Sequence, residues 1–412
     1  MKPLALFLSC GFRPFFLLTA SSAALFMLIW LMILGGWLPG WNPPGGSLLW
    51  HAHELLFGFA AAATAGFALT AVPEFTNTPQ ISGKPLLPLI VLWLLARLGY
   101  LLAPLWPELL GLWPVALCNL AFWLALLRLI APRLWRDSGR RHISFAWIIA
   151  TLAGLQVGFF ISHAMAGNAM DWLRATTGAV MILIIIATSR ISMSVLNGQV
   201  EEGLPGNTAP GTRYLARPPR RNLAIFCIVL CGLAELVYGP GGITGWTALA
   251  VAAAMFNLLN DWHIGRPLFT RWALMMYASY WLIGLGYAAM GLAWLTGGFS
   301  PSAGRHLLTS GAMALSIFAV MNIAGRIHNG NWLDRRLWLP ACAIVLCMAA
   351  LLRLLASLPS WGTVAPTLLS LSGLLWAACF AVYCGYNWIR LSSPREDGQD
   401  GCATPREQGK QH

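Results

Sequence analysis

The sequence predicts an all-α polytopic membrane protein with about twelve transmembrane helices. Hydrophobic residues make up 58% of the 412-residue chain and charged residues only 10%, whereas soluble domains carry about 25% charged residues. Apolar runs of about 20 residues, long enough to cross a bilayer as a helix, recur along the chain. Arginines and lysines gather in every second connection between these runs, which is typical of a chain that crosses a membrane repeatedly.

The apolar runs define the twelve expected spans. In the first half of the chain they are Phe15–Trp37, Trp50–Val72, Leu86–Pro104, Leu110–Ala131, Ser144–Ala166 and Leu173–Leu196. In the second half they are Leu223–Tyr238, Thr244–Trp262, Leu268–Leu295, His306–Gly325, Leu337–Ala356 and Pro366–Ile389. The opening segment Met1–Cys10 lacks a small-residue cleavage site, so we expect a retained first helix and not a removed signal peptide.

Charge orients these spans. The even-numbered connections carry Lys84, Arg133, Arg136, Arg140, Arg141, Arg213, Arg217, Arg220, Arg221, Arg266, Arg335 and Arg336. Positive residues stay on the cytoplasmic side, which predicts that the amino and carboxyl termini are both cytoplasmic. The formal charge of +12 is then explained by membrane topology, and we expect the lipid bilayer, and no nucleic acid, as a partner.

The longest connection divides the spans six and six. We expect a single membrane domain over residues 1–391, with halves 1–196 and 222–391 joined by the basic cytoplasmic loop 197–221. Many transporters share this layout. Residues 392–412 are polar and are expected to form a disordered tail. The nine cysteines, most of them inside apolar runs, indicate no disulfide framework.

The tetrapeptide His51-Ala52-His53-Glu54 stands at the start of the second span. Ionisable groups are costly at that position unless they bind something, and neutral imidazole is the commonest metal ligand in proteins. The topology predicts outward-facing ends for His51, His53, His163 and His306, and inward-facing ends for His142, His263 and His328. Four histidines at one membrane level favour a metal or haem site there, although histidine also occurs near interfaces without a metal.

Helix geometry separates the roles of these residues. On a regular helix His51 and His53 point to nearly opposite sides, whereas His51 and Glu54 share a face. The two histidines therefore serve different centres, or the helix is irregular. Glu54 is a candidate proton relay or partner of a ligating histidine, with a carboxylate at a helix N-terminus as the alternative. Met313 follows His306 at helical spacing and is a candidate ligand, with packing as the alternative.

Four further residues are candidates with a structural alternative. Arg13 suits a haem propionate or a lipid phosphate, or it anchors the first span at the membrane surface. Glu235 lies inside an apolar span, where it either hydrogen-bonds to another helix or marks a proton route. His263 and His328 could ligate a second, inward centre, with interfacial packing as the alternative.

Several motifs together resemble the NnrS family. They are Gly11-Phe12-Arg13-Pro14-Phe15-Phe16, Trp50-His51-Ala52-His53-Glu54-Leu55-Leu56-Phe57-Gly58-Phe59, Gly66-Phe67-Ala68-Leu69-Thr70-Ala71-Val72-Pro73, Arg305-His306-Leu307-Leu308-Thr309-Ser310-Gly311-Ala312-Met313 and His328-Asn329-Gly330. The resemblance implies a bacterial inner-membrane protein that carries haem, of the b type, or copper and acts in the nitric oxide response. Tyr277 stands where the family often has a histidine, and Ser192-Met193-Ser194 stands where a proline-containing turn is expected.

Three functional hypotheses follow. The first is a haem protein, with copper as a candidate second metal, that binds nitric oxide or another small diatomic molecule and acts in its metabolism, detoxification or tolerance. The second is an oxidoreductase of the nitric oxide reductase kind, in which a metal activates the substrate and Glu54 passes protons. No Cys-x-x-Cys-His haem attachment motif occurs, so the electron donor would be external. The third is a transporter of a small anion or metal chelate.

Overall fold

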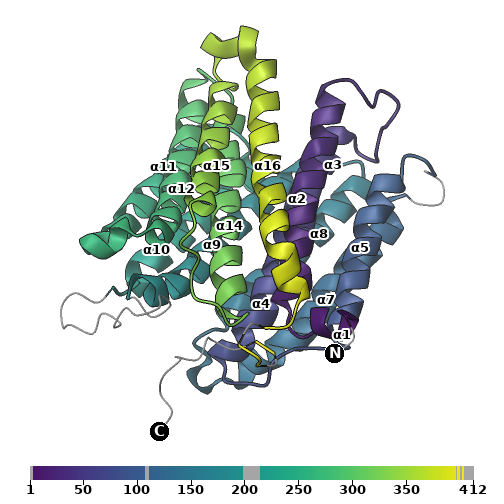
Figure 1. Ribbon diagram of the computed structural model, residues 1–412. Helices are drawn as coiled ribbons and strands as arrows, with labels where there is room; N and C mark the ends of the chain where they lie inside the picture. The colour runs from purple at the N-terminus through teal and green to yellow at the C-terminus, as the bar shows by residue number, and fades with distance from the viewer. Residues whose placement is uncertain (1–2, 107–110, 198–213, 396, 400, 403–412) are drawn as a thin grey trace.

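The structure, a computed structural model, describes residues 3–106, 111–197, 214–395, 397–399 and 401–402. Helices dominate this part of the chain and form one elongated bundle (Figure 1). The amino-terminal elements are α1 (Pro3–Phe7), α2 (Phe12–Leu34), α3 (Ser47–His53), η1 (Glu54–Ala60), α4 (Ala61–Phe75), α5 (Leu86–Leu102), α7 (Leu112–Arg136), η2 (Ser138–Arg140), α8 (Ser144–Ala164) and α9 (Ala169–Leu196). The remaining elements are α10 (Pro218–Tyr238), α11 (Gly242–Leu259), η3 (Asn260–Trp262), η4 (Arg266–Phe269), α12 (Arg271–Thr296), α13 (Ser302–His306), η5 (Leu307–Met313), α14 (Ala314–Ile327), α15 (Trp338–Leu355), η6 (Pro359–Val364) and α16 (Ala365–Ser392).

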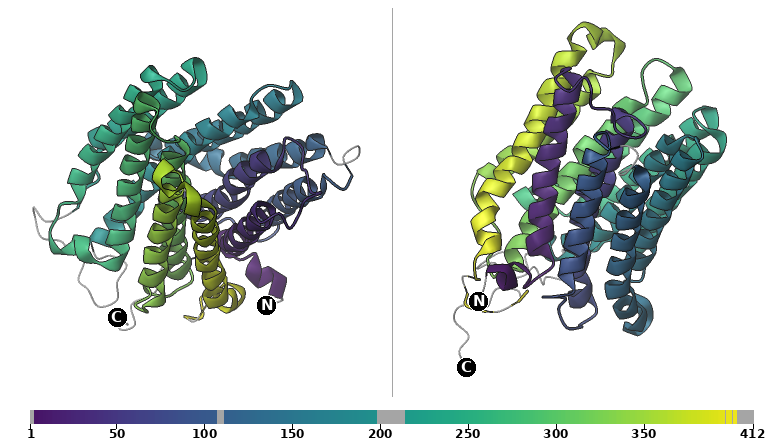
Figure 2. Two further views of the ribbon diagram at one scale, coloured as in Figure 1. Left: turned by 90° about the horizontal axis from the view of Figure 1, so that it is seen from above. Right: turned by 90° about the vertical axis from the view of Figure 1, so that its right-hand side faces the viewer.

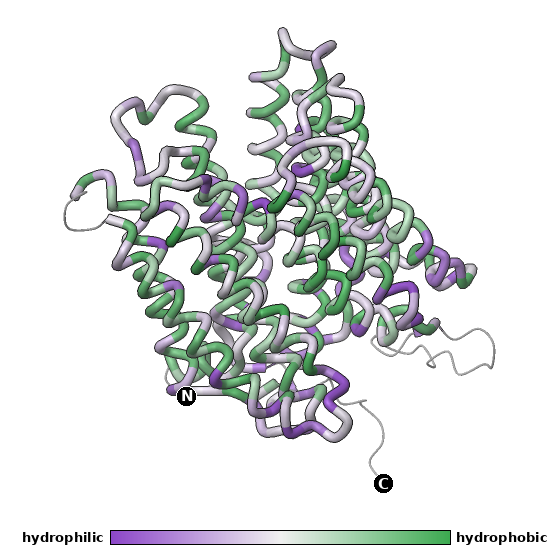
Figure 3. Tube along the Cα trace, turned by 180° about the vertical axis from the view of Figure 1, so that it is seen from behind, coloured by the Kyte–Doolittle hydropathy of each residue, from purple (hydrophilic) through white to green (hydrophobic). Residues whose placement is uncertain are grey.

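The all-α membrane architecture is confirmed. Within the described residues, eleven helices are long and apolar enough to cross a membrane, and α5 is an apolar helix of 17 residues. Each of the twelve expected spans falls on one of these helices. Large apolar side chains such as Leu117, Leu124 and Ile344 are more than 60% exposed on the outer helices, as suits a surface covered by lipid. Figure 3 shows hydrophobic residues along the helices and many hydrophilic ones in the connections.

Three spans form the centre of the bundle. In the most apolar stretch of Ser47–Phe75, 94% of the residues are buried, and the figure is 78% for both Ala169–Leu196 and Ser302–Ile327. No other candidate span of the described chain exceeds 56%. The first and last long helices, α2 and α16, pack side by side, and Figure 2 shows the amino-terminal helices and α10 to α12 on different sides of the bundle. The central spans carry both histidine motifs, which places these motifs in the interior.

Two of the central spans change from α-helix to π-helix directly after a candidate histidine. The segment η1 follows His53, and η5 follows His306. π-Helical segments are rare and often occur at functional sites. Side chains satisfy carbonyl groups along these wider turns, since Trp93 Nε1 donates to the Gly58 oxygen at 3.1 Å and the Ser310 hydroxyl to the His306 oxygen at 2.6 Å. The irregular segment η1 begins after His51 and His53, which both lie on the regular helix α3, so it does not turn the two histidines toward one another.

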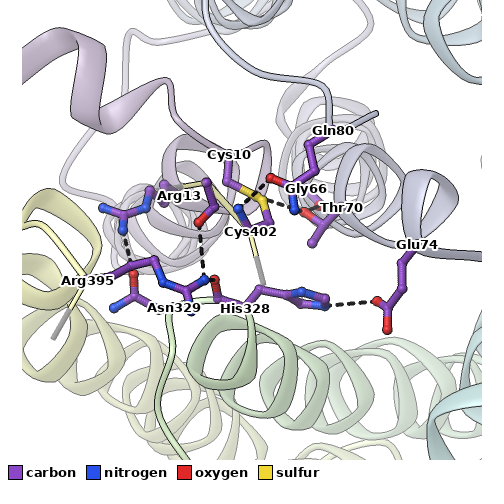
Figure 4. The surroundings of a disulfide bond; sticks show 11 residues. Cys10, Arg13, Gly66, Thr70, Glu74, Gln80, His328, Asn329, Arg395 and Cys402 are labelled. Carbon is purple, nitrogen blue, oxygen red and sulfur yellow. Dashed lines mark hydrogen bonds and ion pairs between the residues drawn. A yellow bond between two sulfur atoms is a disulfide. The ribbon is translucent and has the colours of Figure 1, made fainter. Parts of the chain in front are cut away.

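The first and last described segments of the chain, near α1 and after α16, lie at the same end of the bundle (Figure 1). There Cys10 and Cys402 form a disulfide with a Cα–Cα distance of 5.8 Å, and the Cys402 amide donates to Gln80 Oε1 (Figure 4). We expected no disulfide framework from the sequence, and this one bond was not foreseen. Its two cysteines are 392 residues apart, and so distant a pair leaves no local spacing pattern.

The division into two halves and a tail stays a prediction. Most of the expected basic loop (residues 198–213) and about half of the expected tail (residues 403–412) lie outside the described residues.

Candidate functional site

A cavity of about 550 Å³ lies between the central helices, at the end of the bundle away from the termini. Its volume falls in the range of small-molecule and cofactor sites, roughly 300–1,000 Å³. Four of the residues singled out in the sequence line it: His51, Glu235, His306 and Met313. They come from α3, α10, α13 and η5. The fold thus brings together side chains that are up to 262 positions apart in the sequence.

The imidazole of His306 is held in one orientation. Its Nδ1 lies 2.8 Å from the backbone oxygen of Ser302 and 3.1 Å from the hydroxyl of the same residue. Arg353 Nη2 donates to that hydroxyl at 3.2 Å. An N–H group given to a carbonyl fixes the tautomer and leaves the lone pair on Nε2, which is the usual preparation of a metal-binding histidine. His306 therefore has one ring nitrogen free to act as a ligand.

His51 forms a second potential ligand on the same cavity. Its ring stacks on Trp30, with 4.2 Å between the centroids and 17° between the planes. Its Nδ1 atom is buried and has no hydrogen-bond partner. Because buried polar atoms are nearly always paired in native proteins, this unpaired ring nitrogen on a cavity residue is a candidate donor to a ligand.

His53 turns away from this cavity into a buried hydrogen-bond network. Its side chain has no exposed surface, Nδ1 lies 2.9 Å from Glu54 Oε1, and Nε2 lies 3.1 Å from Gln156 Nε2. Trp123 Nε1 donates to Gln156 Oε1 at 2.7 Å, so the amide nitrogen of Gln156 donates to His53. Both ring nitrogens of His53 are therefore engaged, and neither has a lone pair left for a metal in this arrangement.

Glu54 belongs to the same network and not to the cavity wall. Its Oε2 lies 3.4 Å from Arg97 Nε, and Arg97 Nη2 donates to Asn119 Oδ1 at 2.5 Å. Both members of this ion pair are buried, and a buried charge requires a partner. The sequence interpretation overlooked Arg97 and Gln156. The available signal was their polar character inside apolar spans, which is rare and costly in a membrane.

Arginines provide the positive charge on the cavity wall. Arg305 Nη2 lies 2.6 Å from Glu235 Oε1, and its Nη1 lies 3.5 Å from the other carboxylate oxygen. Arg174, also on the wall, pairs with Asp171 at 2.9 Å. Guanidinium groups suit carboxylate and phosphate partners, so the wall offers two groups that could bind an anionic part of a ligand.

The other predicted site residues lie outside the cavity lining. Arg13 donates to the backbone oxygens of Leu391 (3.2 Å) and Ser393 (2.7 Å) and to Asn329 Oδ1 (2.6 Å), at the end that holds the termini. His328 Nε2 lies 3.4 Å from Glu74 Oε2 nearby (Figure 4).

The two remaining candidate ligands, His263 and His163, contact only neighbouring residues. His263 Nε2 lies 3.3 Å from the Tyr277 hydroxyl. His163 ends α8 beside Gly45. Neither meets another candidate ligand at the cavity.

The side chains that could bind a metal suit a haem iron better than a metal ion held only by the protein. Among the described residues, no group of three or more histidine, cysteine, aspartate or glutamate side chains converges as a metal site. A single ion bound only by protein needs about four such donors, whereas a haem iron needs only one or two because the porphyrin supplies the others. Two histidines on a cavity of cofactor size therefore suit a haem.

Comparison with protein-family models gave a match over residues 6–395 to the family described as NnrS protein. A comparison with curated proteins found no match. The matched region includes every residue of the cavity and of the buried network.

Proposed function

Since this chain belongs to the NnrS family, we propose that it is a haem-binding protein of the bacterial inner membrane that binds nitric oxide and acts in the nitric oxide response. The observation that carries this proposal is the cavity shared by His51 and His306, with the His306 tautomer fixed by Ser302. The basic residues in the even-numbered connections support cytoplasmic termini. The cavity then opens toward the periplasmic side of the membrane.

The residues of the cavity have distinct parts in this proposal. His51 and His306 would hold the haem iron, and Trp30 packs against the His51 ring. Arg174 and Arg305, which line the cavity, would lie available to the propionates, since guanidinium groups suit carboxylate partners. The bound haem would supply an iron that coordinates a diatomic molecule.

A second metal and a reductive chemistry would draw on different residues. Copper in its reduced state favours soft ligands, and Met313 is one of three methionines on the cavity wall, with Met27 and Met170. Reduction of nitric oxide would need a proton donor at the cavity. Glu235 lines the cavity and Glu54 does not, so in this proposal Glu235 takes the role first expected of Glu54.

The test is an absorption spectrum of the full-length protein in detergent, oxidised and reduced, before and after nitric oxide, with iron and copper analysis. We expect a haem spectrum that shifts with nitric oxide and is lost in His51→Ala and His306→Ala. His163→Ala, at the same end of the bundle but outside the cavity, should keep it. Folded protein that is colourless and free of iron, despite adequate haem and copper during expression, would contradict the proposal.

A further inference from the structure

A second, smaller cavity of about 50 Å³ lies in the middle of the bundle, between α2, α4, α9 and α14. Most of its wall is apolar, with Ala63, Phe67, Ile184, Ala187 and Val320 among the lining residues. Its volume exceeds the roughly 10–15 Å³ that one small molecule of the size of water requires. The space is therefore large enough for a diatomic molecule.

The few polar groups on this wall are hydroxyls that are already engaged or isolated. Thr64 Oγ1 donates to the Ala60 oxygen at 2.7 Å, and Ser316 Oγ donates to the Ala312 oxygen at 2.6 Å. Thr188 is the third hydroxyl. A buried water needs two to four polar partners, whereas apolar cavities stay dry and bind molecules such as xenon. The wall therefore favours an apolar occupant over water or an ion.

The two cavities follow one another along the same helices. On α9, Thr177 lines the larger cavity and Val180 lines the smaller one. In the same way, Met313 of η5 and Leu56 of η1 line the larger cavity, and the smaller one is lined by Ser316 and Ala60, three and four residues further along. Three or four residues correspond to roughly 5 Å along a helix axis. The smaller cavity therefore begins about one turn beyond the larger one.

We propose that the smaller cavity is a docking pocket for a small apolar gas molecule beside the metal cavity. A neutral diatomic molecule leaves water without losing strong hydrogen bonds and gains dispersion contacts with the wall. The proposal that a gas pocket exists rests on the volume and the lining of the smaller cavity. Nitric oxide as its occupant rests on the proposed function, and a molecule held there would lie within one turn of the site where it binds.

The first experiment detects gas binding without a metal. Xenon NMR of the full-length protein in lipid nanodiscs should show bound xenon, and Ala187→Leu, which fills the pocket, should abolish that signal. Ala288→Leu on α12 adds the same side chain at a partly exposed position outside both cavities and should leave the signal unchanged. Ile184→Ala enlarges the pocket and should raise xenon occupancy, which keeps the test informative if Ala187→Leu fails to fold. Absence of bound xenon, or equal xenon signals in Ala187→Leu and the parent protein, would contradict the proposal that the smaller cavity binds gas.

The second experiment tests its occupant. After flash photolysis of the nitric oxide complex, we expect Ala187→Leu and xenon pressure each to change the fraction of rapid rebinding, with Ala288→Leu equal to the parent. Unchanged rebinding in Ala187→Leu would overturn nitric oxide as the occupant, even where xenon binds. A protein without haem would contradict the proposed function, and the xenon measurement would still decide whether the gas pocket exists.

Discussion

The Nδ1 atom of His53 lies 2.9 Å from Oε1 of Glu54, its neighbour in the chain. Neighbouring side chains do not face one another on a regular α-helix, and this pair meets where α3 passes into the π-helical η1. Gln156 holds the other ring nitrogen of His53. The short motif therefore serves two environments, with His51 on the cavity and the next two polar residues in a buried network.

Removal of the Gln156 amide should weaken the fold without affecting the proposed haem site. Gln156→Leu leaves His53 Nε2 and Trp123 Nε1 buried without partners, so we expect the free energy of unfolding to fall by about 1–3 kcal/mol. Thermal unfolding in detergent and iron analysis provide the measurements, with the exposed Thr151→Ala on the same helix as control. Loss of iron from folded Gln156→Leu would show that His53 belongs to the metal site.

The Arg305–Glu235 pair should be energetically coupled. Each side chain is less than 20% exposed, so removal of one partner leaves a poorly solvated charge on the cavity wall. A double-mutant cycle with Arg305→Gln and Glu235→Gln should give a coupling energy of about 1–3 kcal/mol. The more exposed Arg174–Asp171 pair is the control, with an expected coupling below about 1 kcal/mol. Equal coupling in the two pairs would contradict this prediction.

Arg13→Lys should loosen the carboxyl-terminal segment. A compact ammonium cannot reach all three acceptors that the planar guanidinium of Arg13 contacts. We expect faster hydrogen exchange at the end of α16, measured by mass spectrometry, and an unchanged haem spectrum. The exposed Arg128→Lys on α7 should exchange like the parent. A changed haem spectrum would support the original hypothesis that Arg13 contacts the cofactor.

The Asp334 carboxylate should make the stability of the fold depend on pH below about pH 4. Burial alone would raise the pKa of Asp334, but hydrogen bonds from Arg336 and Trp338 and the charge of Arg326 outweigh it and hold the pKa well below its ordinary value. Such a carboxyl stabilises the fold above its unfolded pKa of about 4, and this contribution disappears as the pH falls toward the folded pKa. The Tm of the parent should therefore fall more steeply below about pH 4 than that of Asp334→Asn. Parallel curves would contradict the prediction.

The transmembrane architecture could be predicted because a helix that crosses a bilayer must consist mainly of apolar residues. A span must be apolar over its whole length, so the twelve runs were visible without any tertiary information. The π-helical segments were not, because nothing in the composition of Glu54–Ala60 distinguishes it from an α-helix. Its wider turn depends on tertiary partners such as Trp93, which donates to the Gly58 oxygen from another helix.

The candidate site could be predicted only in part. His51, His306, Met313 and Glu235 were singled out from their residue types and do line one cavity. The separation of His53 from His51 follows from their spacing, because both lie on the regular helix α3 and residues two apart point to nearly opposite sides. The roles of Arg97 and Gln156 depend on helix packing between α5, α8 and η1, which sequence analysis does not provide.

The bond between Cys10 and Cys402 turns the enclosed backbone into a covalent ring. A single proteolytic cut in any connection of that ring would leave the two pieces joined through sulfur, and they would separate only after reduction. Cytosolic conditions keep most thiols reduced, so with cytoplasmic termini the ring would be open in resting cells and closed after oxidation. The same polypeptide would then exist in two topological forms, one linear and one circular, that share their helices and differ in how the chain can be taken apart.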